Sequence, residues 1–203
     1  RTMPEISIEW TEGFTVGNEP YFSKVSFKFF DNIGVKEYEI NGNVVALGLN
    51  QWSNANYDNF KQYLKEGKNV IILRDMAGNE AEYEFYYDNT PARRSATNLL
   101  VYGDKNENKI FYAKIGDTIQ AYISFNEKLA HNPTFTLIND GKEYEVDSSL
   151  VTENEKDGKY IYQILYKIEE NTEFVNGEIT LKITNLEDMY GNRIEDETKP
   201  TNG

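Results

Sequence analysis

The stretch VIILRDMAGNEAEYEFYY, residues 70–87, has a turn signal between two runs with the character of β-strands. Its first run is rich in β-branched residues, which favour strands. Its second run alternates aromatic and polar residues, the aromatics being Tyr83, Phe85 and Tyr87. Between the runs, Asp75 can bond its own backbone two residues on, while Gly78 and Asn79 tolerate left-handed backbone angles. The stretch therefore predicts two antiparallel strands joined by a compact turn at residues 75–79.

The turn motif occurs twice in the chain. DMAGN at residues 75–79 reappears as DMYGN at residues 188–192, and a β-type run precedes each copy. After each copy, an acidic stretch ends in Thr and Pro, at residues 88–91 and 196–200. The opening residues 2–4, TMP, resemble the end of the same junction. Three junctions thus bracket two repeats, which is typical of a fragment of a longer array.

Apolar residues between the junctions recur with a period of two rather than 3.6. One buried and one solvated face per strand is the pattern of antiparallel sheets. In the first repeat the alternating residues also include Ile6, Ile8, Trp10, Val25, Phe27 and Phe29. In the second repeat they are Ile119, Ala121, Ile123, Phe125, Tyr160, Tyr162, Ile164, Tyr166, Ile168, Ile179, Leu181 and Ile183. We expect these side chains to form the cores, with Trp10 among them.

Turn signals separate the predicted strands, at Asn41-Gly42, Asp140-Gly141, Asp157-Gly158 and Asn176-Gly177. Short strands with frequent turns, over about 100 residues per repeat, predict β-sandwiches. The sequence therefore predicts an all-β protein with two tandem antiparallel sandwiches.

We place the two sandwiches at residues 1–91 and 98–203, with a short linker at 92–97. One segment of the first sandwich departs from the strand pattern. The spacing of Tyr57, Phe60 and Leu64, followed by Gly67, predicts a short helix within residues 56–66.

Composition limits the classes of partner. Lys and Arg total 21 against 34 Asp and Glu, which gives a net charge of −13. An acidic field repels phosphate backbones and anionic lipid, so we expect no nucleic-acid binding. No run approaches the roughly 20 apolar residues that cross a bilayer, so we expect no direct membrane insertion. Cysteine is absent, which excludes disulfides, thiolate metal sites and cysteine nucleophiles.

The first repeat resembles a known family. DNIGV at residues 31–35, DMAGN at 75–79 and the exit DNTP at 88–91 are similar to the bacterial Ig-like repeats. These occur in tandem in secreted and wall-attached proteins of Gram-positive bacteria. The resemblance covers residues 4–91. The second repeat matches less well, and keeps GDTI at residues 116–119 together with DMYGN.

The resemblance implies two immunoglobulin-like sandwiches in an extracellular protein, secreted or attached to the bacterial cell surface. It implies a non-catalytic, monomeric module that acts as a structural spacer or adheres to protein. Its partners would be neighbouring Ig-like repeats and a host or cell-wall protein or glycan. Some related modules carry Lys–Asn or Lys–Asp isopeptide crosslinks, but no spacing singles out an Asn or Asp partner for Lys24, Lys28 or Lys114. The shared motifs transfer no ligand and no binding residue.

Catalytic motifs are absent from the sequence. The single histidine, His131, precedes Asn-Pro and is interpreted as a surface turn residue. There is no G-x-S-x-G, H-E-x-x-H, P-loop or G-x-G-x-x-G sequence. Carboxylates are plentiful, but small sandwiches seldom provide the cleft that a glycosidase pair needs. We therefore expect no enzymatic activity.

Two sets of residues are candidates for binding. Trp52 lies among amides in a predicted loop, and with Tyr57 it would suit a sugar, whose apolar face stacks on exposed rings. This would make the chain a carbohydrate-binding accessory module of a secreted glycoside-acting enzyme. The favoured interpretation is instead that Trp52 covers one end of the core. For Asp75, Asp88 and Asp188 the favoured role is structural, with calcium coordination as the alternative. No other cofactor is expected.

Overall fold

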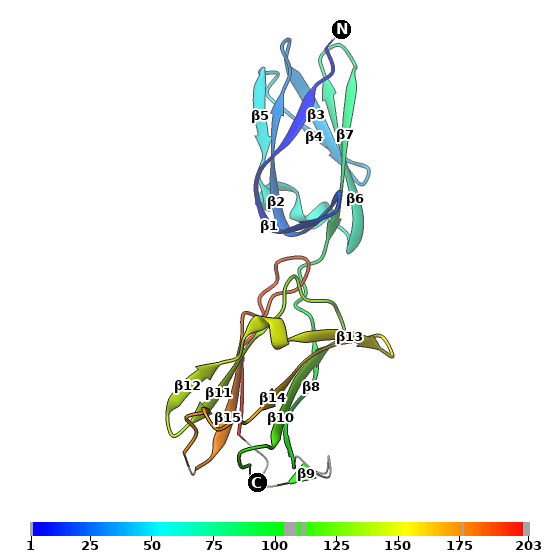
Figure 1. Cartoon of the computed structure of the whole chain (residues 1–203). Helices are drawn as coiled ribbons and strands as arrows, with labels where there is room; N and C mark the ends of the chain where they lie inside the picture. Colours follow the sequence, from blue (N-terminus) through cyan, green and yellow to red (C-terminus); the bar gives the residue numbers. More distant parts are fainter. Residues whose placement is uncertain (1, 104–108, 111–112, 176, 201–203) are drawn as a thin grey trace. The chain divides into compact units, whose positions relative to one another are not determined.

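The computed structural model describes residues 2–103, 109–110, 113–175 and 177–200 (Figure 1). Within these ranges the chain is mostly β-strand, which confirms the all-β prediction. It divides into two compact units. Unit 1 comprises Arg1–Thr90 with Met189–Asn192, and unit 2 comprises Pro91–Asp188 with Arg193–Gly203.

Unit 1 is built around a long central strand, β2. Its strands are β1 (Glu5–Val16), β2 (Glu19–Phe30), β3 (Val35–Ile40), β4 (Asn43–Ala46), β5 (Trp52–Ala55), β6 (Gly67–Asp75) and β7 (Glu80–Tyr87). The strand order is β1-β2-β7-β6-β3-β4, and β5 pairs with β2. The start of β2 pairs in parallel with β7 at Tyr21 and Phe22, whereas its end, Phe27–Phe30, lies between β1 and β5. One strand thus connects two groups of strands around a single core.

The core of unit 1 is aromatic. Val25, Phe27, Phe29 and Phe85 are fully buried, as the alternation predicts. The predicted helix is confirmed but short: α1 (Tyr57–Phe60) continues into a 3₁₀ turn, η1 (Lys61–Tyr63). The helix serves to bury Phe60, whose ring centroid lies 6.0 Å from that of Phe27. Gly67, expected as the helix stop, instead begins β6.

Unit 2 contains two sheets. Its strands are β8 (Arg94–Tyr102), β9 (Lys109–Ile110), β10 (Thr118–Phe125), β11 (Thr134–Asn139), β12 (Lys142–Glu145), β13 (Thr152–Lys156), β14 (Lys159–Lys167), β15 (Ile179–Thr184) and β16 (Glu197–Pro200). The sheet orders are β13-β14-β10-β8-β9 and β12-β11-β15-β16. Alternate residues of β10, β14, β11 and β15 form one shared core, which is a sandwich-like arrangement. A second 3₁₀ turn, η2 (Ser148–Leu150), connects β12 to β13.

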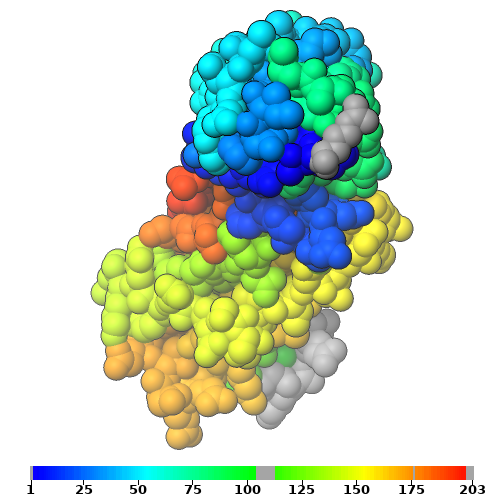
Figure 2. Space-filling view, turned by 90° about the horizontal axis from the view of Figure 1, so that it is seen from above, coloured from blue at the N-terminus to red at the C-terminus, as the bar shows by residue number. Residues whose placement is uncertain are grey.

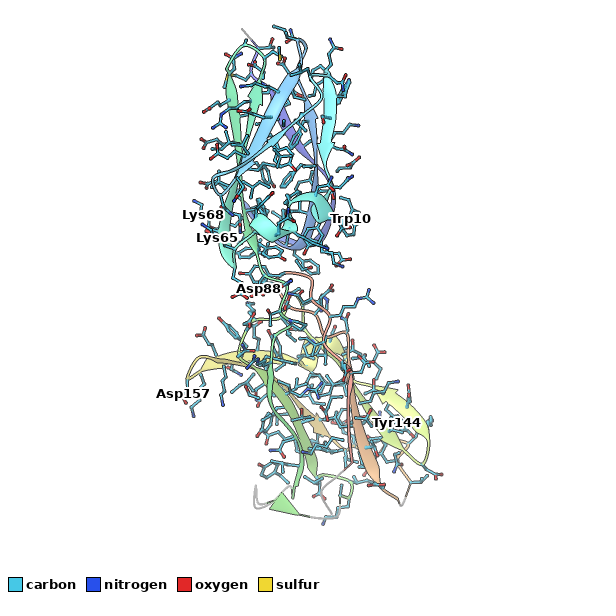
Figure 3. All side chains as sticks on the ribbon, turned by 180° about the vertical axis from the view of Figure 1, so that it is seen from behind. Trp10, Lys65, Lys68, Asp88, Tyr144 and Asp157 are labelled. Carbon is cyan, nitrogen blue, oxygen red and sulfur yellow. The ribbon has the colours of Figure 1, made fainter. Side chains whose placement is uncertain are left out.

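Three of the predicted turns close hairpins with left-handed backbone angles at both residues. The φ angles are 49° and 85° at Asn41-Gly42, 49° and 75° at Asp140-Gly141, and 53° and 70° at Asp157-Gly158. These signs are those of type I′ turns, whose twist matches that of the flanking strands. The three predictions are therefore confirmed, and Figure 3 shows Asp157 at the tip of its hairpin. The fourth signal, Asn176-Gly177, includes a residue outside the described ranges.

The structure differs from one predicted boundary and from one predicted turn. Most of the predicted linker, from Arg94 onwards, belongs to strand β8, and Ala92 is buried in the core of unit 2. The second motif, at residues 188–192, lies between two strands that do pair antiparallel, β15 and β16, but it is not a tight turn that joins their ends. It lies in a longer excursion closed by a bridge between Glu187 and Arg193. The reason is that Asp188 is buried and accepts a hydrogen bond from the Ala92 N–H at 3.2 Å, so its carboxylate ties the strand connection to the start of the unit.

Candidate functional site: an exposed aromatic sheet face

Strands β1, β2 and β5 of unit 1 present an outward face with three aromatic residues. Side chains of β2 alternate, so Phe27 and Phe29 point into the core while Lys28 and Phe30 point outwards. Residues directly opposite in an antiparallel ladder share a face. Trp52 lies opposite Phe30 and is therefore on the outer side. We define the β1–β2–β5 face by its outward residues Glu5, Ser7, Trp10, Glu12, Lys24, Lys28, Phe30, Trp52 and Asn54.

Trp10 belongs to this face, and its predicted place in the core is wrong. The alternation of Ile6, Ile8 and Trp10 is interrupted by a bulge between Ile8 and Trp10. Ile8 lies opposite Phe27, an inward residue, but Trp10 lies opposite Ser26 on the other face of β2. An extra residue in one strand reverses the face of every side chain beyond it. Trp10 is consequently 48% exposed, and Figure 3 shows its side chain projecting from β1.

Trp52 does not cover the core, contrary to the favoured interpretation. It begins strand β5 instead of lying in a loop, and it is 57% exposed. Its ring centroid lies 4.3 Å from that of Phe30, and the Lys28 Nζ lies 5.0 Å from its centroid. Two side chains of β2, Phe30 and Lys28, therefore hold the exposed indole of Trp52 in place. The β5 segment, cyan in Figure 2, lies at the surface of unit 1.

Tyr57 is not brought together with Trp52. Its hydroxyl lies 2.9 Å from that of Tyr87, and its N–H donates to Ser26 Oγ at 3.1 Å. Burial, together with the hydrogen bond between the Tyr57 and Tyr87 hydroxyls, raises the pKa of Tyr87 above its ordinary value. Tyr57 follows Trp52 by five residue steps of mostly extended chain, a span of about 16 Å. Tyr57 therefore supports the core and leaves the sugar-binding pair predicted from sequence incomplete.

Asp75 organises the β6–β7 turn. One carboxylate oxygen accepts the N–H groups of Ala77 and Asn79 at 2.8 and 2.7 Å, and the other accepts Asn79 Nδ2 at 2.5 Å. Burial alone would raise the pKa of Asp75, but hydrogen bonds from Asn79, Ala77 and Gly78 outweigh it and lower the pKa below 3.8. Both oxygens are thus engaged by the turn itself.

The three candidate calcium ligands are not grouped. Asp88 follows the far end of β7, so about 26 Å of strand separates it from Asp75. The Asp88 carboxylate accepts the Thr90 N–H at 2.7 Å, and Asp188 belongs to the core of unit 2. In the described part of the chain, no three His, Cys, Asp or Glu side chains are placed to hold a metal ion.

Replacing Asp75 with asparagine should destabilise unit 1 by about 2 kcal/mol at neutral pH, because hydrogen bonds to a charged acceptor are lost. A carboxyl group whose pKa is lowered by folding stabilises the fold above its unfolded pKa. That contribution disappears as the pH falls through the lowered folded pKa. The deficit of Asp75→Asn should therefore shrink below pH 4 or so. Urea unfolding of the wild type and of Asp75→Asn at pH 7 and pH 3 measures this loss of stability. An equal loss at both pH values would contradict the stabilising role of the ionised Asp75 carboxylate.

His131 and the three lysines are surface groups. The His131 Nε2 lies 3.6 Å from a Glu187 oxygen, and the ring is partly exposed. Lys24 forms an ion pair with Glu12 at 3.0 Å. Lys24, Lys28 and Lys114 are all exposed. No spacing or contact among the described residues draws any of these lysines into a core.

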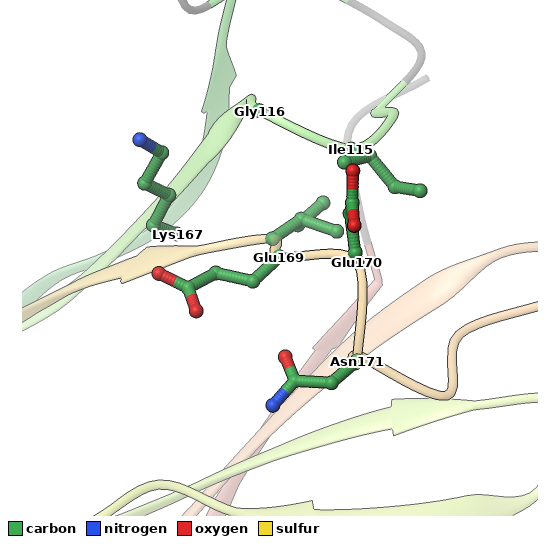
Figure 4. A pocket seen from close by; sticks show the side chains of 7 residues that line it. Ile115, Gly116, Lys167, Glu169, Glu170 and Asn171 are labelled. Carbon is green, nitrogen blue, oxygen red and sulfur yellow. The ribbon is translucent and has the colours of Figure 1, made fainter.

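Unit 2 has a shallow, open depression of about 450 Å³ (Figure 4). It is lined by Ile115, Gly116, Lys167, Ile168, Glu169, Glu170 and Asn171. Gly116 and Ile168 meet there through a backbone hydrogen bond of 2.8 Å. The depression is thus an open gap between two loops, with the charged side chains of Lys167, Glu169 and Glu170 in its lining.

No protein-family model matches the chain, and no curated protein is similar to it. None of the helices in the described ranges has the length and apolar character to cross a bilayer. The candidate site therefore depends on the geometry of the β1–β2–β5 face. Trp10 was missed as a member of it, since a bulge leaves no reliable mark in a single sequence.

Proposed function

We propose that the chain is a non-catalytic part of a bacterial extracellular or cell-surface protein, made of two tandem Ig-like sandwich modules. It would act as a structural spacer and as a region that adheres to a partner. Each unit has its own buried core, so neither depends on the other for its apolar interior. Such self-contained modules suit a surface protein that carries a binding region away from its anchor.

The observation that carries the adhesive role is the exposed aromatic face of unit 1. Trp10 and Trp52 are the two tryptophans of the chain, and both lie on its surface. Tryptophan is strongly enriched where proteins bind partners. Phe30 adds a third ring, which supports that of Trp52.

The adhesive role predicts saturable binding through this face. The whole chain would be immobilised and probed with purified extracellular-matrix proteins and polysaccharides. Binding to at least one ligand should weaken more than tenfold in the double variant Trp10→Ala/Trp52→Ala. Met76→Ala, which removes another exposed apolar side chain of unit 1, should have no effect. If none of these ligands bound, the adhesive role would be contradicted. If the chain broke down any of the polysaccharides, the non-catalytic role would be contradicted.

A further inference from the structure

We propose that the β1–β2–β5 face binds a neutral polysaccharide, with Trp10 and Trp52 stacking on sugar rings. The inference rests on the proposed adhesive function and names its ligand class. The C–H face of a pyranose ring is apolar and flat, so it packs on an exposed indole. The site differs from the one predicted by sequence, because Trp10 replaces Tyr57 as the second aromatic residue.

The Trp52 ring is ordered before any ligand arrives. Phe30 lies against it at a centroid distance of 4.3 Å, and the Lys28 ammonium lies 5.0 Å from its centroid. A side chain already held in its binding position loses little conformational entropy on association. Phe30 and Lys28 are therefore positioning residues, and the part of Trp52 that they leave exposed, in a residue that is 57% exposed, is the contact for a sugar.

The spacing of the two indoles suits a chain of sugars. Trp10 lies opposite Ser26 and Trp52 opposite Phe30, on the two strands that flank β2. Four residues along β2 and two interstrand spacings place their Cα atoms about 17 Å apart. That span exceeds a single sugar ring. The surface between the two indoles is the outward face of the sheet, which suits an extended polysaccharide that lies across it.

The polar residues of the face favour an uncharged ligand. Ser7 and Asn54 are exposed, and although the Ser7 hydroxyl donates to the Lys28 carbonyl at 3.3 Å and Asn54 Nδ2 to Asn56 Oδ1 at 3.5 Å, their oxygen atoms can accept hydrogen bonds from sugar hydroxyl groups. The cation of Lys24 is paired with Glu12, and that of Lys28 lies over Trp52. The face therefore offers no cluster of unpaired cations, and the net charge of −13 repels anionic glycans.

The same arrangement is less suited to a protein partner. Protein interfaces have a contiguous apolar centre that excludes water. Here Lys28 and Ser7 lie between the two indoles on the ladder, so the aromatic residues do not form one apolar patch. Separate stacking positions with polar groups between them match a sugar chain, in which apolar ring faces alternate with hydroxyl groups.

The experiment is affinity electrophoresis of the whole chain in gels that contain neutral β-glucan, mannan or xylan, or anionic hyaluronan or heparin. At least one neutral polysaccharide should retard the wild type. Trp10→Ala and Trp52→Ala should each weaken binding about tenfold, the size of one aromatic contact. Trp52→Phe should retain part of it, and Met76→Ala all of it. Unchanged melting temperatures show that the variants are folded.

The outcomes separate the inference from the proposed function. Undiminished retardation of the double variant, or retardation by anionic polysaccharides alone, would overturn the inference. Binding to matrix proteins but to no polysaccharide would also overturn it and leave the adhesive function standing. Binding to neither class would overturn both.

Discussion

Replacing Phe27 with alanine should lower the free energy of unfolding of unit 1 by about 3–5 kcal/mol, the usual cost of truncating a buried phenylalanine. The ring is fully buried, and its centroid lies 5.5–6.0 Å from those of Phe60, Tyr83 and Phe85. Its removal leaves a cavity bounded by β2, β7 and the short helix. Because both tryptophans lie in unit 1, urea unfolding followed by tryptophan fluorescence measures this unit alone.

The matched control is Phe125→Ala, which makes the same change in the core of unit 2. It should shift the circular-dichroism transition and leave the fluorescence transition in place, because the two cores are separate. If both variants moved the fluorescence midpoint equally, the two units would unfold as one cooperative body, against the account given above.

Replacing Asn69 with aspartate should destabilise unit 1 by a similar amount, about 3–5 kcal/mol, although the two side chains have the same shape. Asn69 is fully buried, and its Nδ2 donates to the carbonyls of Lys65 and Gly67 at 2.7 and 2.8 Å. Its Oδ1 accepts from Asn41 Nδ2 at 2.7 Å and from the Lys65 N–H at 3.0 Å. Aspartate would turn both donors into acceptors that face carbonyl oxygens.

The measurement is again urea unfolding by tryptophan fluorescence at pH 7. Asn43→Asp is the control, since Asn43 is an exposed residue and its side chain can turn towards solvent. We expect a loss below about 1 kcal/mol there. A change at Asn69 no larger than that at Asn43 would contradict the structural role of the buried amide.

The strands and hairpins were predictable because they follow local rules. The period of two identifies the inward residues of β10, Ile119, Ala121, Ile123 and Phe125, all fully buried. Asn-Gly and Asp-Gly pairs accept left-handed backbone angles, so the turn type could be inferred from two residues. The DMAGN turn is equally local, because Asp75 bonds atoms within four residues of itself.

The candidate site depends on non-local facts that the sequence pattern hides. One bulge residue, Glu9, changes the face on which Trp10 lies, and alternation counted along the chain misses it. Trp52 is exposed because it pairs with the end of β2, twenty-two residues earlier in sequence. The second copy of the turn motif differs from the first because Asp188 is engaged by Ala92, which lies far away in sequence.

The most direct test of the central claim follows the two indole N–H signals by NMR in the chain labelled with ¹⁵N-tryptophan. Trp10 and Trp52 give the two signals, and each is assigned with its alanine variant. If both indoles stack on sugar rings, both signals shift during titration with a neutral oligosaccharide from the polysaccharide that retards the chain, and they do so with one shared dissociation constant. Saturable binding of that oligosaccharide with both signals unmoved would show that it binds elsewhere and would contradict the account.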